Sequence, residues 1–291
     1  MKVLILGADG MIGHKMAQLL NKELGLEIIL NSRSNSKILS QLYPKCKIYE
    51  FDFLKDDINN LLDIIEPDLI INAVGITIRR GVEDIKKASV INSFFPHKID
   101  NWVSKFDKKL IHFSTDCVYS GNKGDYLDND IPDAEDNYGK SKASGEVNSK
   151  NTLTIRSSMV GREIFNKTEL FEWVVSNKNK KINGFENAVY SGVTTLWMSK
   201  TVIKILKEFP DLTGIYNISS ESISKFDLIC KINNRFGLNI DIESDKSFFS
   251  NKSLNSNKFF LKTNLEKPNW DEMLLRLYND SIENNNIYNL K

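Results

Sequence analysis

The stretch Lys2-Val-Leu-Ile-Leu-Gly-Ala-Asp-Gly-Met-Ile-Gly13 decides the fold. A short apolar run ends at Gly7, and three glycines spaced by three residues lead into a segment with helical spacing. Such glycines let the backbone turn sharply, approach a pyrophosphate and pack the helix on the strand, while the helix amino terminus faces the phosphates. The spacing differs by one residue from the usual dehydrogenase fingerprint, so an ordinary strand-to-helix turn is the alternative. Cofactor contacts are expected at Gly7, Gly10, Met11, Ile12 and Gly13.

Short apolar runs alternate with helical stretches, which is typical of a parallel sheet with helices on both faces. The expected strands are Lys2–Leu6, Glu27–Leu30, Cys46–Glu50, Leu69–Asn72, Leu110–Phe113 and Thr152–Ile155. The expected helices between them are Met11–Glu23, Lys55–Ile65, Val82–Lys105 and Asn137–Ser149. Later helices are expected at Thr168–Asn177, Thr194–Glu208, Ser224–Phe236 and Asp271–Tyr278.

These patterns predict an α/β fold: a Rossmann-like doubly wound parallel sheet with a smaller carboxyl-terminal substrate-binding lobe. We place the NAD(P)-binding domain at residues 1–155 and the lobe at residues 156–291, with some segments of the lobe returning to the first domain.

The composition excludes several classes of function. The 291 residues carry 39 Lys and Arg against 38 Asp and Glu, with no basic block to bind nucleic acid or an anionic membrane surface. The amino-terminal apolar run is too short for a signal peptide or a membrane span, which favours a cytoplasmic location. Three widely spaced cysteines and three histidines favour reduced thiols and predict no metal site.

Tyr138 and Lys142 lie four residues apart on an expected helix, so their side chains share one face. A cation beside a phenol favours the phenolate, whose formation otherwise has a pKa of about 10, and makes the tyrosine a usable proton donor near neutrality. Thr115, in Ser114-Thr-Asp116, could hydrogen-bond the same substrate oxygen. Such a pair is weak evidence alone, but its order after the glycine turn indicates hydride transfer at a carbinol carbon.

The expected second strand is followed by Asn31-Ser-Arg33, where an NAD site usually carries an acid for the ribose hydroxyls. Arg33 could instead meet a 2'-phosphate, which favours NADPH over NADH, although a solvated loop charge is the alternative. Further cofactor contacts are expected after the third and fourth strands, at Asp52, Phe53, Ala73, Val74 and Gly75. Tyr138 and Lys142 are also expected to contact the cofactor, the lysine at the nicotinamide ribose.

The chain resembles the extended short-chain dehydrogenase/reductases and, within them, the dTDP-4-dehydrorhamnose reductase-like proteins. The segments that carry this resemblance are Gly7 to Gly13, Pro67 to Gly75, Ile91-Asn92, Ser114 to Gly121, and Asp136 to Lys142 with Gly145-Glu146. The resemblance implies catalytic roles for Thr115, Tyr138 and Lys142, a structural or proton-relay role for Asn92, and a lobe that binds a nucleoside-diphosphate sugar. It also implies reduction of a C4 ketone on a 4-keto-6-deoxy sugar, as in the biosynthesis of bacterial surface polysaccharides.

Cys117 separates the reactions of the similar proteins. The 4,6-dehydratases carry glutamate at this position, so Thr115-Asp-Cys117 argues against dehydration. GDP-fucose synthase-like epimerase-reductases carry a cysteine there as epimerising base, but their mechanism also uses a histidine after the Tyr-x-x-x-Lys pair, and none follows Lys142 here. Reduction is therefore the main hypothesis, with Cys117 as a buried thiol. The epimerase-reductase reading and a non-catalytic NADP-binding regulatory subunit, as in methionine adenosyltransferase β-subunit-like proteins, stay open.

Substrate contacts are expected at Thr115, Asp116, Cys117 and Arg162. Arg162 is a candidate for the diphosphate because a guanidinium binds phosphate in a bidentate fork. Similar rhamnose-pathway reductases form a magnesium-bridged dimer through acidic residues, one on the first helix. His14 and Lys15 occupy that part of the helix here, so we expect no metal, while a homodimer stays possible.

Overall fold

The computed structural model describes residues 1–77 and 84–289. The chain forms two compact units. Unit 1 consists of Met1–Ser114, Asp136–Ile155 and Ser199–Ile215, and unit 2 of Thr115–Glu135, Arg156–Met198 and Tyr216–Lys291. A segment before residue 156 therefore belongs to unit 2, and a later segment belongs to unit 1.

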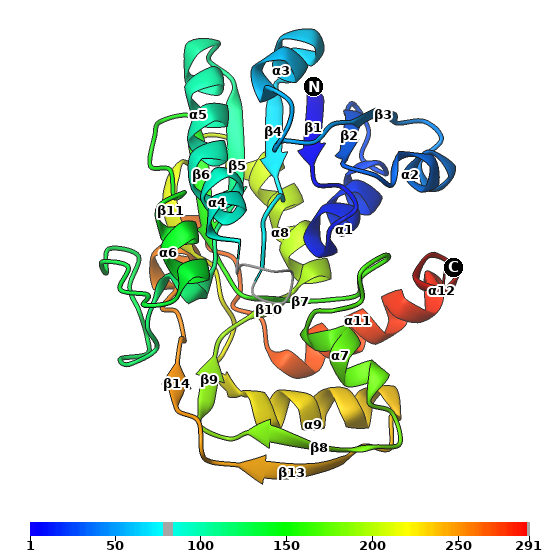
Figure 1. The fold of residues 1–291 in the computed structure, drawn as a ribbon, viewed down its shortest axis with the longest axis vertical. Helices are drawn as coiled ribbons and strands as arrows, with labels where there is room; N and C mark the ends of the chain where they lie inside the picture. The colour runs from blue at the N-terminus through cyan, green and yellow to red at the C-terminus, as the bar shows by residue number, and fades with distance from the viewer. Residues whose placement is uncertain (78–83, 290–291) are drawn as a thin grey trace. The chain divides into compact units, whose positions relative to one another are not determined.

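A seven-stranded sheet forms the centre of unit 1, in the order β11-β6-β5-β4-β1-β2-β3. The strands are β1 (Lys2–Leu6), β2 (Glu27–Ser32), β3 (Lys47–Glu50), β4 (Leu69–Asn72), β5 (Lys109–Phe113), β6 (Thr152–Arg156) and β11 (Gly214–Asn217). Strands β1 to β6 pair in parallel, and Figure 1 shows β2, β1 and β4 side by side. This confirms the predicted α/β class and doubly wound parallel sheet.

The strand order reverses direction between β1 and β4. The chain runs outward from β1 through β2 to β3, and then returns to β4 on the other side of β1 before it continues to β5 and β6. In open parallel sheets, ligands bind outside the carboxyl ends of the strands at such a switch point. The loops after Leu6 and Asn72 therefore define where a ligand of unit 1 would lie.

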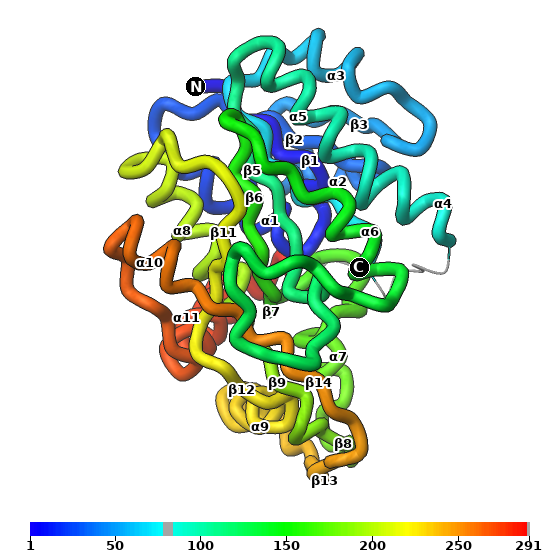
Figure 2. Tube along the Cα trace, turned by 90° about the vertical axis from the view of Figure 1, so that its left-hand side faces the viewer, coloured from blue at the N-terminus to red at the C-terminus, as the bar shows by residue number. Residues whose placement is uncertain are grey.

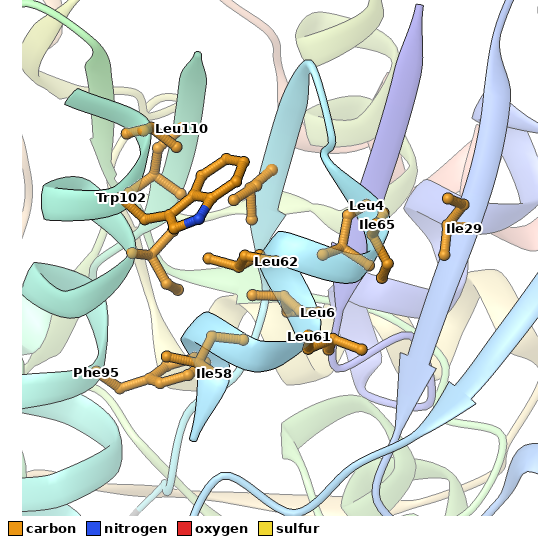
Figure 3. Packing of buried hydrophobic residues seen from close by; sticks show 13 residues of the cluster. Leu4, Leu6, Ile29, Ile58, Leu61, Leu62, Ile65, Phe95, Trp102 and Leu110 are labelled. Atoms are coloured by element: carbon orange, nitrogen blue, oxygen red, sulfur yellow. The ribbon is translucent and has the colours of Figure 1, made fainter. Parts of the chain in front are cut away.

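One face of the sheet is covered by α3 (Ile58–Ile65) and α5 (Phe95–Lys105). Figure 3 shows how their apolar side chains pack on those of β1, β2 and β5. Leu62, Ile99 and Val103 are completely buried there, and burial of one such side chain stabilises a fold by about 1.5–3 kcal/mol. Trp102 completes the cluster while its indole Nε1 donates to Asp63 Oδ1 at 2.7 Å.

The opposite face is covered by α1 (Met11–Leu20) and by residues 199–208 of α8 (Thr195–Glu208). Lys207 forms an ion pair with Glu23, which follows α1, at 2.5 Å. Figure 2 shows α8 on the side of the strands away from α3 and α5. Both faces of the sheet are therefore covered, as the continuous apolar strands require.

Several predicted helix boundaries were wrong. The helix expected at Val82–Lys105 consists of α4 (Ile85–Ala88), a π-helical segment η2 (Ser89–Phe94) and α5, and its first two residues lie outside the described part of the chain. The helix α6 (Asn137–Ala143) ends six residues before the predicted end. The helix α2 (Ser36–Leu42) was not predicted, because seven residues are too few for helical spacing to be distinguished from chance; Leu39 is its one buried residue.

Unit 2 contains short strands and amphipathic helices. The strands pair as β7 (Met159–Val160) with β10 (Val193–Thr194), as β12 (Ile223–Ser224), β9 (Ala188–Tyr190) and β14 (Ser250–Asn251), and as β13 (Asp241–Asp245) with β8 (Lys181–Phe185). The helices are α7 (Leu170–Ser176), α9 (Lys225–Phe236), α10 (Asn257–Thr263), α11 (Trp270–Glu283) and α12 (Asn285–Tyr288). Among the α-helices described in unit 2, α7, α8 and α9 match predicted ones within two residues, and α11 ends five residues after its predicted end. The helices α10 and α12 and the short strands were not predicted.

Candidate active site

The glycine-rich turn joins β1 to α1. Gly7 has φ +75°, a conformation that favours glycine, and a Cβ on Gly13 would lie 2.0 Å from the Gly7 carbonyl oxygen. Helix α1 therefore approaches the turn as closely as backbone allows. The N-cap Gly10 offers no side chain to the N–H groups of the first turn, which include those of Met11 and Ile12. A phosphate fits this end of the helix, because an anion there accepts from uncapped N–H groups and meets the positive end of the helix dipole.

Asn31 holds the turn against the second strand. Its side-chain oxygen accepts from Gly7 N at 3.3 Å, and its carbonyl oxygen accepts from Ala8 N at 2.9 Å. Its side-chain nitrogen donates to the carbonyl oxygens of Tyr49 and Phe51. The buried side-chain amide of Asn31 therefore links the ends of β1, β2 and β3.

A carboxylate that the sequence did not predict lies at the end of β2, and it comes from the glycine turn. The Asp9 carboxylate accepts from Ser32 Oγ at 2.9 Å and from Asn35 Nδ2 at 2.8 Å, so a residue of the glycine turn supplies a negative charge at this strand end. Arg33 is exposed beside it. A 2'-phosphate would be attracted by the guanidinium and repelled by the carboxylate. The aspartate within Gly7-Ala-Asp-Gly10 was the available signal.

The loop after β4 packs against the glycine turn. A Cβ on Gly7 would lie 3.2 Å from both Ala73 O and Val74 Cγ2. The Asn72 side-chain oxygen accepts from Val74 N at 3.1 Å, and its nitrogen lies 3.1 Å from His112 Nδ1, so His112 accepts there and carries its proton on Nε2. His112 is completely buried, and burial, with the charge of Lys142 next, holds its pKa well below its usual range.

The other predicted cofactor residues differ in their surroundings. Phe53 is partly buried on the core cluster, with its ring centroid 4.3 Å from that of Phe95. The Asp52 carboxylate accepts from Leu54 N at 3.1 Å and pairs with Lys55 at 3.6 Å, so it caps its own turn. Gly75 lies near the Asn92 side chain, with 3.7 Å from the position of a Cβ to Asn92 Oδ1.

Helix α6 carries Tyr138 and Lys142 one turn apart on one face. The helix begins after Asp136, whose carboxylate accepts from Gly139 N at 2.8 Å. Tyr138 is partly exposed, whereas Lys142 is 4% exposed and its Nζ donates to Phe113 O at 2.7 Å. Burial lowers the pKa of Lys142 to about 8, and the Glu146 carboxylate opposes this shift.

The π-helical segment η2 packs directly on α6. Asn92 Nδ2 donates to Ser141 Oγ at 3.0 Å, and Ser141 Oγ donates to the Tyr138 carbonyl oxygen at 2.8 Å. Asn92 also exchanges hydrogen bonds with the backbone of Ile76, at 2.9 and 3.0 Å. A Cβ on Gly145 would lie 1.8 Å from Asn92 O, which explains the glycine after α6. Asn92 therefore couples the loop after β4 to the helix that carries Tyr138.

Unit 2 contains Thr115, Asp116 and Cys117, on a single 3-10 turn. Thr115 Oγ1 accepts from Cys117 N and donates to Asp116 Oδ1, both at 3.1 Å. Burial and the Asp116 carboxylate raise the pKa of Cys117 to about 12, although the charges of Lys252 and Lys225 oppose the shift. The thiol is thus protonated at neutral pH and is a poor base.

Arg162, also in unit 2, is engaged within the protein. Its Nε donates to Glu172 Oε1 at 2.7 Å, and its guanidinium lies 4.5 Å from the centroid of the Tyr288 ring. The Glu172 carboxylate also accepts from Glu163 N at 3.0 Å. Its role as a diphosphate ligand stays a prediction.

The parallel sheet, the glycine turn at its switch point and the Tyr138–Lys142 pair define a NAD(P)-dependent oxidoreductase of the short-chain dehydrogenase/reductase type. More narrowly, the chain belongs to the RmlD substrate binding domain family, whose family model matches residues 1–246. This confirms the family predicted from the sequence. The curated proteins contain no match to the chain.

Solved structures of sugar-nucleotide enzymes share the fold. A hypothetical dTDP-4-dehydrorhamnose reductase from Sulfolobus tokodaii is 26% identical, with 92% of this chain and 96% of that chain covered and a TM-score of 0.77. A dTDP-4-dehydrorhamnose reductase from Bacillus anthracis in complex with NADP is 22% identical, with 96% and 99% covered and a TM-score of 0.76. A dTDP-glucose 4,6-dehydratase from Bacillus anthracis in complex with NAD is 17% identical, with 99% and 98% covered and a TM-score of 0.78.

Two features are absent from the described part of the chain. Within residues 1–77 and 84–289, no helix has the length and apolar character needed to span a membrane. Over the same ranges, no group of three or more His, Cys, Asp or Glu side chains is arranged to hold a metal ion.

Proposed function

We propose that the protein reduces the C4 ketone of a nucleoside-diphosphate 4-keto-6-deoxy sugar with NADPH. The observation that carries this proposal is the buried Lys142 ammonium, anchored on Phe113 O one helical turn from Tyr138. A buried lysine is costly to a fold and is found where a charge is needed for chemistry. The family membership and the solved reductases favour a sugar nucleotide as the substrate.

The cofactor site of this proposal is the glycine turn with the loop after β4. The backbone of Gly7 and the uncapped first turn of α1 would hold the pyrophosphate, while Val74 and Gly75 would line the path of the cofactor. NADPH supplies the hydride for the reduction when it is bound. The exposed Arg33 favours NADPH, because its guanidinium attracts the 2'-phosphate. The Asp9 carboxylate repels that phosphate, so NADH is the alternative cofactor.

The protein's own residues handle the proton. Tyr138 donates its phenolic proton to the ketone oxygen, which becomes the hydroxyl of the product, and the Lys142 ammonium stabilises the phenolate that remains. Thr115 would donate the second hydrogen bond to the same oxygen. This role is inferred from the order in which the motifs follow one another in the sequence. Such bonds stabilise the charge that develops on oxygen more strongly in a dry site than they would in water.

The test is oxidation of NADPH with a panel of 4-keto-6-deoxy nucleotide sugars, with wild type and Tyr138→Phe compared. The variant keeps the ring but has no transferable proton, so turnover should fall about 100-fold to 10,000-fold while NADPH affinity stays nearly unchanged. Tyr278→Phe, on α11, is the matched control and should keep full activity. Substantial turnover by Tyr138→Phe would overturn the assignment.

The chemistry of Cys117 bears on the alternative epimerase-reductase. An epimerising base must be deprotonated at neutral pH, and a thiol with a pKa of about 12 is not. We therefore propose reduction without epimerisation. A homodimer, a cytoplasmic location and a role in surface polysaccharide synthesis are further parts of this proposal, which rest on the resemblance to the dTDP-4-dehydrorhamnose reductase-like proteins.

A further inference from the structure

Tyr190 ends the central strand of the three-stranded sheet in unit 2. Strand β12 pairs with β9 so that Ile223 lies opposite Tyr190, and Lys225 follows two residues later as the first residue of α9. Strand β14 pairs with the other edge of β9, and the backbone N of Lys252, just after β14, donates to Val189 O at 2.9 Å. The sheet therefore places one lysine on each side of the same tyrosine.

The Tyr190 phenol is fixed and fully buried. It is 2% exposed, and its hydroxyl has no hydrogen-bond partner among the described residues. A Cβ on Gly192 would lie 2.6 Å from Tyr190 Cε2, and the Trp270 ring centroid lies 5.8 Å away, so the ring has little freedom to turn. Burial, and then the Asp116 carboxylate, raises the pKa of Tyr190 well above its usual range, so the hydroxyl keeps its proton and can donate it in a hydrogen bond. A buried donor without a protein acceptor is costly, so this hydroxyl needs a water molecule or a ligand to accept its proton in a hydrogen bond.

The two lysines lie close to this phenol and to the Thr115–Cys117 turn. Lys225 Nζ is 3.4 Å from the Tyr190 ring centroid. Lys252 packs beside Gly121, since a Cβ there would lie 3.2 Å from Lys252 Cγ, and Asn251 N donates to Gly121 O at 2.6 Å. Both ammonium groups are near enough to Cys117 to lower its pKa. Two lysine side chains thus lie near the Tyr190 ring and the Thr115–Cys117 turn, beside a neutral hydrogen-bond donor.

We propose that Lys225, Lys252 and the Tyr190 hydroxyl bind the diphosphate of the nucleotide sugar. Two ammonium groups match the charge of a diphosphate, and lysine binds phosphate as a point charge without the planar fit that arginine requires. Arg162, the sequence-based candidate, is instead held by Glu172 and stacked on Tyr288. This inference rests on the proposed function for the identity of the ligand.

The experiment measures binding of free nucleoside diphosphates by calorimetry, which needs no turnover. Thymidine, guanosine, uridine, cytidine and adenosine diphosphates are titrated into wild type, and the tightest is compared with its monophosphate and nucleoside. Lys225→Met, Lys252→Met and Tyr190→Phe should each weaken diphosphate binding about tenfold. Lys231→Met, an α9 lysine paired with Asp271, is the control and should bind as wild type does. NADPH affinity, measured in parallel, should stay unchanged in all variants, which separates this phosphate site from that of the cofactor and shows that the variants are folded.

The outcomes separate this inference from the proposed reaction. Lysine-dependent diphosphate binding without turnover of any 4-keto sugar would support the subsite and contradict the reduction. Diphosphate affinity within twofold of wild type in both lysine variants would overturn the subsite, as would a wild type that binds no nucleoside diphosphate. Loss of binding in Arg162→Met alone would return the role to the arginine.

Discussion

Replacement of Lys142 by methionine should change the pH dependence of stability. Burial lowers the pKa of Lys142 from 10.5 to about 8, so between these values the unfolded chain binds a proton that the folded chain does not. The stability of the wild type therefore gains a contribution as the pH rises through this range, and a methionine variant lacks it. The full shift corresponds to about 3 kcal/mol, and about 2 kcal/mol of it is expressed between pH 7 and about pH 9.5.

The loss of one hydrogen bond does not obscure this effect. Lys142 Nζ donates to Phe113 O at 2.7 Å, and a methionine leaves that carbonyl oxygen without its donor. An unsatisfied buried acceptor costs about 1–3 kcal/mol. That cost is the same at both pH values. It lowers the free energy of unfolding of Lys142→Met by a constant amount and leaves the pH-dependent difference from wild type unchanged.

The assay is urea unfolding of wild type, Lys142→Met and Lys140→Met at pH 7 and about pH 9.5. The stability of wild type relative to Lys142→Met should increase by about 2 kcal/mol at the higher pH. Lys140 is exposed on the same helix, so its variant should follow the wild type at both values. A difference between wild type and Lys142→Met that is the same at both pH values would refute the account of a buried, destabilised charge.

Three further predictions concern other residues. Arg33→Ala should reduce the preference for NADPH over NADH about tenfold to a hundredfold in a titration of both cofactors, and equal affinities in wild type would remove the argument. Folding lowers the pKa of His112, so the contribution of its neutral form to stability is fully present above the unfolded value of about 6.5 and is lost as the pH falls below it. The free energy of unfolding of wild type should therefore fall below pH 6.5 by about 1 kcal/mol per pH unit relative to His112→Gln. An equal pH dependence of the two proteins in acid would contradict this. Turnover in deuterated water should place no deuterium on the carbons beside the ketone, and incorporation that Cys117→Ser abolishes would favour the epimerase-reductase.

The sequence predicted the parts of unit 1 that depend on local pattern. Strands β1 and β4 were predicted to the residue because both are short runs of buried apolar residues bounded by turn signals. The glycine spacing located the turn, because the requirement for Gly7 and Gly13 comes from backbone within a few residues. The π-helical segment was not predicted, because it lies between α4 and α5 without a break and such i→i+5 segments are rare within α-helices.

Contacts between residues that are far apart in the chain could not be predicted from the sequence. Asp9 acts at the end of β2 only because the sheet places Ser32 beside the glycine turn. The rest of α9, β13 and β14 separate Lys225 from Lys252 in the sequence, and nothing in their neighbours indicates that they are partners. Arg162, in contrast, was chosen for its residue type, but the fold supplies Glu172 as its acceptor.

The charges beneath α6 follow one physical requirement, which is to keep a single cation buried beside Tyr138. The charge of Lys142 disfavours a charge on His112, and the buried imidazole is the group that stays neutral. Its neutral form accepts from Asn72, which in turn holds Val74 in the loop after β4. A protonated His112 could not accept that bond. Protonation of His112 would therefore add a second charge near Lys142 and remove the acceptor of the Asn72 side chain. Acid should disturb the loop after β4 before it disturbs the core.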